Sequence, residues 1–127
     1  EADIIVAFEK VEALRALPYL RKGGKIVMDE REIYSMPVLI GQQEYPHEAD
    51  KVLKETVKDV VIVPASKIAE ELGSVRSQNI CLLGALIAAL NLEGVDWEKL
   101  VASSVPPKTI DVNVAAFKAG YKAVKPN

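Results

Sequence analysis

Four polar side chains occupy positions suited to binding an anionic ligand: Arg31, Arg76, Asn79 and Asn113. Arg31 follows an apolar run that predicts a strand, and α/β sheets bind ligands at the carboxyl ends of their strands. Arg76 and Asn79 lie at the start of a predicted apolar helix, where a guanidinium and free helix N–H groups can hold an anion. Asn113 lies in the first turn of the last predicted helix. The alternative is structural: the asparagines satisfy loop backbone groups, and Arg31 pairs with a nearby glutamate.

The sequence offers no catalytic centre. No serine lies in a Gly-x-Ser-x-Gly elbow. Cys81 lies inside the apolar helix segment without a neighbouring base, which favours a small buried residue over a nucleophile. His47 follows a proline at a predicted helix start, and a solvated surface residue is favoured there over an acid or base. No pair of carboxylates stands out, so we predict no catalytic residue in this chain.

Metal binding is also disfavoured by the composition. The sequence has 1 cysteine and 1 histidine. Iron–sulfur clusters are commonly held by four cysteines, and zinc sites combine several Cys or His ligands. We therefore predict no metal ligand in this chain.

Size, charge and hydropathy indicate an ordinary soluble domain. The 127 residues carry a formal net charge of −2 and are 50% hydrophobic, which favours one domain over residues 1–127 with a real core. Nothing in this charge favours nucleic acid or an anionic membrane as partner. The most apolar stretch, residues 80–90, is too short to span a bilayer, and we expect a cytoplasmic location.

The first thirty residues predict a β-α-β unit. Residues 4–8 (IIVAF) form a continuous apolar run, typical of a strand covered on both faces. Residues 9–17 have helical spacing and end at Pro18. Gly23-Gly24 is then expected to form a turn, and it is no phosphate cradle because it leads into a strand at residues 25–29.

The remainder of the chain predicts one more strand and mostly helices. Residues 30–46 are expected to be irregular, with one short edge strand at residues 38–40. The other expected elements are a helix at 47–57, a strand at 60–63, a helix capped by Ser66 and ended by Gly73, an all-round apolar helix at 78–90, and two helices capped by Asp96 and Asp111.

This order predicts an α/β fold, a three-layer Rossmann-like and mostly parallel sheet flanked by helices. The chain begins with Glu1-Ala2-Asp3 and enters its first strand at once. We interpret this as a fold that is incomplete at its N-terminus, with an upstream segment removed.

Three segments in the right order resemble one family: ADIIVAFEKVEALRALPYLRKGGKIV, GSVRSQNICLLGAL and VPPKTIDVNVAAFKAGYKA. They are similar to the gamma-type domain of the 2-oxoacid:ferredoxin oxidoreductases, and most similar to the small (beta) subunit of the indolepyruvate type. The strand and Gly-x-Gly-Gly-Gln-Gly turn that open the family domain have no counterpart here, so the chain resembles its C-terminal two thirds. The segment after Arg31 also departs from the family pattern, which leaves its ligand contacts and the 2-oxoacid open.

The resemblance implies a reaction shared between subunits. A large (alpha) subunit would carry thiamine diphosphate and iron–sulfur clusters, an aryl 2-oxoacid would be decarboxylated to an acyl-coenzyme A, and ferredoxin would take the electrons. This chain would bind no cofactor alone and would complete the complex, with Arg31, Arg76, Asn79 and Asn113 as candidates for coenzyme A contact. The alternatives are a stand-alone module that binds coenzyme A or a nucleotide, and a structural fragment that forms a homodimer in isolation.

Overall fold

A parallel three-stranded sheet in the order β1-β2-β3 organises the structure. The computed structural model describes residues 1–34 and 36–126. Its elements, in chain order, are β1 (Ala2–Ala7), α1 (Lys10–Ala16), η1 (Leu17–Tyr19), β2 (Leu20–Asp29), α2 (Met36–Leu39), α3 (Ala49–Thr56), β3 (Asp59–Val63), α4 (Ala65–Glu71), η2 (Val75–Ser77), α5 (Gln78–Leu90), α6 (Trp97–Ser104), η3 (Pro107–Thr109) and α7 (Ile110–Val124).

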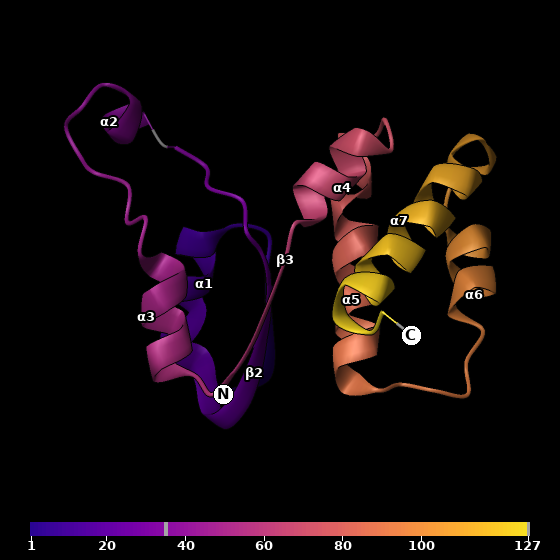
Figure 1. Ribbon diagram of the computed structural model, residues 1–127, viewed down its shortest axis with the longest axis horizontal. Coiled ribbons are helices and arrows are strands. Elements are labelled where there is room, and N and C mark those ends of the chain that lie inside the picture. Colours follow the sequence, from indigo (N-terminus) through magenta and orange to yellow (C-terminus); the bar gives the residue numbers. More distant parts are fainter. Residues whose placement is uncertain (35, 127) are drawn as a thin grey trace.

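Helices cover both faces of the sheet, as the α/β prediction required (Figure 1). On one face, α1 and α3 bury Ala13 and Leu53 against β1 and β2. On the other, α4, α5 and α7 pack around Val27 and Val63. The helix α6 lies outside this layer and packs on α7. The prediction of a three-layer fold with a parallel sheet is confirmed.

The strand β1 is an edge strand, and the prediction that both of its faces are covered is wrong. Ile5 and Ala7 are buried on the side of α1 and α3, but Val6 on the other side is 38% exposed. The cause is the position of α5, which packs over β2 and β3. The central strand β2 has the two-sided burial expected of β1.

Gly23 and Gly24 lie inside β2 instead of forming a turn before it. Pairing with β1 jumps from Ala2↔Leu20 to Ile4↔Lys25, so extra residues of β2 bulge out of the register. Gly23 takes φ +81°, and a side chain on Gly24 would overlap Leu20 and the carbonyl of Asp3. The two glycines therefore permit a bulge.

Three further local predictions are wrong. Residues 38–40 are no strand, because Val38 belongs to the short helix α2 and Ile40 N donates to Met36 O at 3.0 Å. The helix α4 has Pro64 as its N-cap, and no Ser66 side-chain cap forms. Asp111 lies within the first turn of α7, after the N-cap residue Thr109.

Other turn and cap predictions are confirmed. The Asp96 carboxylate accepts a hydrogen bond from Lys99 N at 3.1 Å and caps α6. Gly73 follows α4 in the left-handed conformation, at φ +86°. The apolar segment 78–90 is the helix α5, which is covered by the sheet, α4 and α7.

The helices α5 and α7 approach so closely that only glycine fits at their crossing. A Cβ on Gly84 would overlap the carbonyl oxygen of Phe117, and a Cβ on Gly120 would overlap that of Cys81. Both obstacles are helix backbone, which cannot move aside like a flexible side chain. The two glycines therefore set the distance between the helices that form the second layer.

Changing Gly84 or Gly120 to alanine tests this contact by the sign of the change in the free energy of unfolding. Helix propensity alone predicts a gain of about 1 kcal/mol for Gly→Ala. Backbone overlap predicts a loss of about 3 kcal/mol in the free energy of unfolding. Urea denaturation followed by Trp97 fluorescence measures the difference, with Lys122→Ala on the exposed face of α7 as control. A stabilised G84A or G120A protein would contradict the close approach.

Candidate functional site

Asp29 organises the carboxyl edge of the sheet. It is the last residue of β2 and is fully buried. Its Oδ1 accepts from Arg31 N at 3.1 Å, and its Oδ2 accepts from Ser66 N at 2.8 Å and from Gln78 Nε2 at 2.6 Å. A buried carboxylate is tolerated when such donors replace water. These bonds tie β2 to the loop after it, to α4 and to α5.

Hydrogen bonds extend from Asp29 across the edge. The Gln78 side chain also donates to Phe8 O at 3.0 Å, just beyond the end of β1. The neighbouring Ser77 Oγ donates to Asn113 Oδ1 at 3.1 Å, and Asn113 Nδ2 donates to Thr109 O at 3.0 Å. The first turns of α5 and α7 are thereby held beside the strand ends.

The four predicted ligand residues lie at this edge, and they differ in burial and hydrogen bonding. Asn113 is buried, and both ends of its amide are used in the hydrogen bonds to Ser77 and Thr109, which is the structural alternative. Arg31, Arg76 and Asn79 are exposed. Asn79 Oδ1 accepts from Ile80 N at 2.8 Å. Among residues 1–34 and 36–126, neither arginine side chain takes part in an ion pair.

A second buried carboxylate, Glu9, holds the loop that follows β2. Its Oε1 accepts from Val11 N at 2.8 Å and Glu12 N at 3.1 Å, and so caps α1. Its Oε2 accepts from Ile33 N at 2.9 Å and from the Tyr45 hydroxyl. Burial and the bond to Glu9 raise the pKa of Tyr45 above its ordinary value, so this hydroxyl keeps its proton and remains a donor.

Glu32 joins the two ends of the same loop. It accepts from Lys10 Nζ at 3.2 Å and from Tyr34 OH at 2.9 Å, and it lies 2.9 Å from His47 Nδ1. Burial acts to raise the pKa of Glu32, but the bonds from Tyr34, Lys10 and His47 lower it overall. The rings of Tyr34, Tyr45 and His47 stack edge-on or tilted, 5.0–6.1 Å apart. His47 is thus exposed but tethered, which agrees with the favoured surface role.

Sequence reasoning did not identify Glu9, Asp29 or Tyr45 as organising residues. The signal that was present is an acidic residue at the end of the first two apolar strand runs, IIVAFE and KIVMD. An acid at that position lies at the carboxyl edge of a parallel sheet, where backbone N–H groups of the following loops and helices are free.

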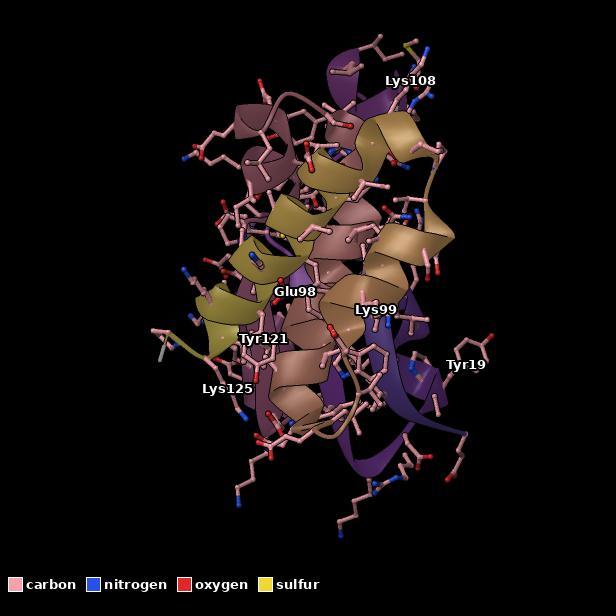
Figure 2. The ribbon with its side chains drawn as sticks, turned by 90° about the vertical axis from the view of Figure 1, so that its right-hand side faces the viewer. Tyr19, Glu98, Lys99, Lys108, Tyr121 and Lys125 are labelled. Carbon is pink, nitrogen blue, oxygen red and sulfur yellow. The ribbon has the colours of Figure 1, made fainter. Side chains whose placement is uncertain are left out.

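One groove lies away from this edge. It measures about 560 Å³ between the start of α6 and the last turns of α7, and it is lined by Trp97, Phe117 and Tyr121 among others. Figure 2 shows Tyr121 of α7 and Glu98 of α6 on this outer face. None of the four predicted ligand residues lines it. A smaller cavity of about 230 Å³ lies under the loop after β2, beside Glu9 and Tyr45.

Cys81 has no features of a nucleophile. It is fully buried in α5, and burial, with a contribution from the Asp29 charge, raises the pKa of its thiol to about 11. In the part of the chain that the structure describes, no cluster of His, Cys, Asp or Glu could hold a metal ion. Among the same residues, no helix combines the length and apolar character needed to cross a membrane.

Similarity to known proteins covers nearly the whole chain. Residues 1–123 match the model of the family described as pyruvate ferredoxin/flavodoxin oxidoreductase. Indolepyruvate oxidoreductase subunit IorB of Thermococcus kodakarensis is 39% identical over 130 residues, which cover 98% of this chain and 64% of that protein. The chain thus spans less than two thirds of this relative.

Two solved structures share the fold. The gamma subunit of a keto/oxoacid ferredoxin oxidoreductase from Geobacter sulfurreducens superposes with a TM-score of 0.69 at 19% identity, over 99% of this chain and 66% of that one. The 2-oxoglutarate:ferredoxin oxidoreductase of Magnetococcus marinus, solved with 2-oxoglutarate, coenzyme A and succinyl-CoA bound, gives 0.67 at 21% identity, over 100% of this chain and 20% of that one.

Replacing Asp29 by alanine tests its role at the edge. Three donors would lose their acceptor, one in a buried bond and two in partly buried bonds, so we expect D29A to lower the free energy of unfolding by about 3 kcal/mol. The matched control is Asp59→Ala at the opposite end of the sheet, whose half-exposed ion pair with Lys25 predicts a loss below about 1 kcal/mol. Urea denaturation measures both, and equal small losses would show that Asp29 does not organise the edge.

Proposed function

The chain belongs to the pyruvate ferredoxin/flavodoxin oxidoreductase family, and from that membership we propose that it is the small subunit of a 2-oxoacid:ferredoxin oxidoreductase of the indolepyruvate type. The observation that carries the proposal is the 39% identity to an indolepyruvate oxidoreductase subunit over 98% of this chain. The family resemblance stated from the sequence is thereby confirmed, and the substrate is part of the proposal.

In the proposed reaction an aryl 2-oxoacid is decarboxylated, its acyl group passes to coenzyme A, and two electrons pass to ferredoxin. Thiamine diphosphate and iron–sulfur clusters on a larger partner subunit would supply the bond cleavage and the electron path. This chain contains one cysteine, which is buried in α5, so its own residues do not fit a cluster held by four thiolates. Its contribution is a surface that completes the active site, and we propose a cytoplasmic location.

The carboxyl edge of the sheet is the part of the chain that we assign to this role. Ligands of parallel α/β sheets bind outside the carboxyl ends of the strands. Exposed Arg31 and Arg76 lie there, and among the described residues neither side chain takes part in an ion pair. Guanidinium groups pair well with phosphate oxygens, so we assign to both the phosphates of coenzyme A. Asn79 and Asn113 would act from the same edge, Asn113 by fixing the helix ends.

Activity should require both subunits. We assign no catalytic residue to this chain, so we expect 2-oxoacid-dependent dye or ferredoxin reduction only when it is mixed with the larger subunit. Measuring the rate with indolepyruvate for each subunit and for the mixture checks this expectation. Turnover by this chain alone would contradict the proposal, and tight binding of coenzyme A to the isolated chain would favour a stand-alone binding module.

The KM for coenzyme A tests the role that we assign to the two arginines. We expect Arg31→Ala or Arg76→Ala to raise the KM for coenzyme A about tenfold, the loss of roughly one charge-assisted hydrogen bond. Arg21→Ala, at the amino end of β2, is the control and should leave this KM unchanged. An arginine whose removal changes neither KM nor kcat does not contact coenzyme A.

A further inference from the structure

The loop after β2 carries an apolar tip that the rest of the chain does not cover. Figure 1 shows α2 at the far end of this loop, beyond α1 and α3. Five large apolar side chains are 44–66% exposed within one short segment: Ile33, Tyr34, Met36, Leu39 and Ile40. Apolar side chains that gather in this way on a surface mark sites of protein interaction. Tyr and Met are also among the residue types enriched at interfaces.

The backbone of this apolar tip is ordered by its own hydrogen bonds. Ile40 N donates to Met36 O at 3.0 Å, and Gln42 N donates to Pro37 O at 2.8 Å. Gly41 closes the turn in the left-handed conformation, at φ +80°. Met36 and Leu39 therefore project from a defined helical turn, Ile40 directly follows it, and Ile33 and Tyr34 belong to the loop before it.

Both ends of the loop are fastened to the body of the domain. Glu9 accepts from Ile33 N on the outgoing side and from the Tyr45 hydroxyl on the returning side. Glu32 accepts a hydrogen bond from Lys10 of α1 and lies beside His47, which is on the returning side of the loop. A loop held at both ends loses less conformational freedom on binding, which raises affinity for a partner.

From this arrangement we infer that the apolar tip is a preorganised docking element that inserts into an apolar socket on the larger subunit. The inference rests on the proposed function for the identity of the partner. Glu9 and Tyr45 act as positioning residues for the tip, because they contact the loop stems and not the partner.

The charges beside the tip indicate the chemistry of the socket. Glu30, Glu44 and Glu48 flank it, are exposed, and form no ion pair among the described residues; they outnumber Arg31, the exposed cation next to Glu30. In a symmetric pair of two copies the same acidic flanks would meet, and like charges disfavour that contact. An anionic membrane surface is disfavoured for the same reason. A socket with an apolar floor and a rim of Lys or Arg is complementary.

The test measures the affinity of full-length variants for the larger subunit. We expect Met36→Ser with Leu39→Ser to raise the Kd about 100-fold, since truncated anchors cost roughly tenfold each. The control is Val52→Ser with Leu100→Ser, which removes two apolar side chains that are 45% and 48% exposed on α3 and α6 and should leave the Kd unchanged. Circular dichroism should show both variants folded.

The Tyr45→Phe variant tests the docking role independently. It removes the hydroxyl that fastens the loop but leaves the apolar tip intact. We expect faster proteolytic cleavage of the loop and a Kd raised about tenfold. Both effects can be measured on Tyr45→Phe even if the serine variant fails to fold. Increasing salt should weaken wild-type binding, because the acidic flanks meet a cationic rim.

Each other outcome overturns a stated claim. Wild-type affinity in the serine variant, or a loss confined to the control, would remove the docking role and leave the proposed function in place. Failure of the wild-type chain to bind the larger subunit would contradict the proposed function itself. Self-association that the serine variant abolishes, with binding to the larger subunit unchanged, would assign the tip to a second copy of this chain.

Discussion

A carboxylate that is removed from water at the end of the central strand constrains everything around it. Asp29 is fully buried, and its charge is compatible with burial only while its hydrogen-bond donors stay in place. Those donors come from the loop after β2, from α4 and from α5. The loop and both helices are therefore hydrogen-bonded to the same carboxylate. The Gln78 side chain also donates to Phe8 O, which connects this network to the end of β1. Glu9 does the same for α1 and the returning side of the loop.

A second constraint comes from the crossing of α5 and α7. The backbones meet at Gly84 and Gly120, and this close approach places the first turn of α7 beside the first turn of α5. The hydrogen bond from Ser77 to Asn113 depends on that placement. The layer that supports the carboxyl edge is thus set by small residues in the helices and by buried polar groups at their ends. Arg31, Arg76 and the apolar tip are presented on this support.

Local sequence patterns predicted most of the architecture. Apolar runs located the three strands, and the apolar segment 78–90 located α5, because hydrophobic periodicity reflects burial directly. The errors arose where tertiary contacts decide. Gly23-Gly24 signals a turn in isolation, but pairing with β1 draws both glycines into β2. β1 has the composition of a buried strand, yet one of its faces is open, and no pattern within β1 encodes which neighbours cover it.

The sequence indicated where the four candidate residues lie in the fold, but not the hydrogen bonds that build the edge around them. Arg31, Arg76 and Asn79 are exposed at the carboxyl edge, as their positions after β2 and at the start of α5 indicated. Asp29, Glu9 and Tyr45 were missed, because a lone acid beside a strand gives no local sign of which distant backbone groups will donate to it. The bond between Glu9 and Tyr45 spans 36 residues, which no spacing rule captures.

We propose that the carboxyl edge of the sheet is the face that meets the larger subunit. Hydrogen exchange of the chain, free and in complex with the larger subunit, tests this most directly. We expect complex formation to add protection at residues 30–48 and 72–79, while the outer face of α6 and the amino ends of the strands exchange at unchanged rates. Protection confined to α6 and the groove beside Trp97, with the carboxyl edge unaffected, would contradict the account.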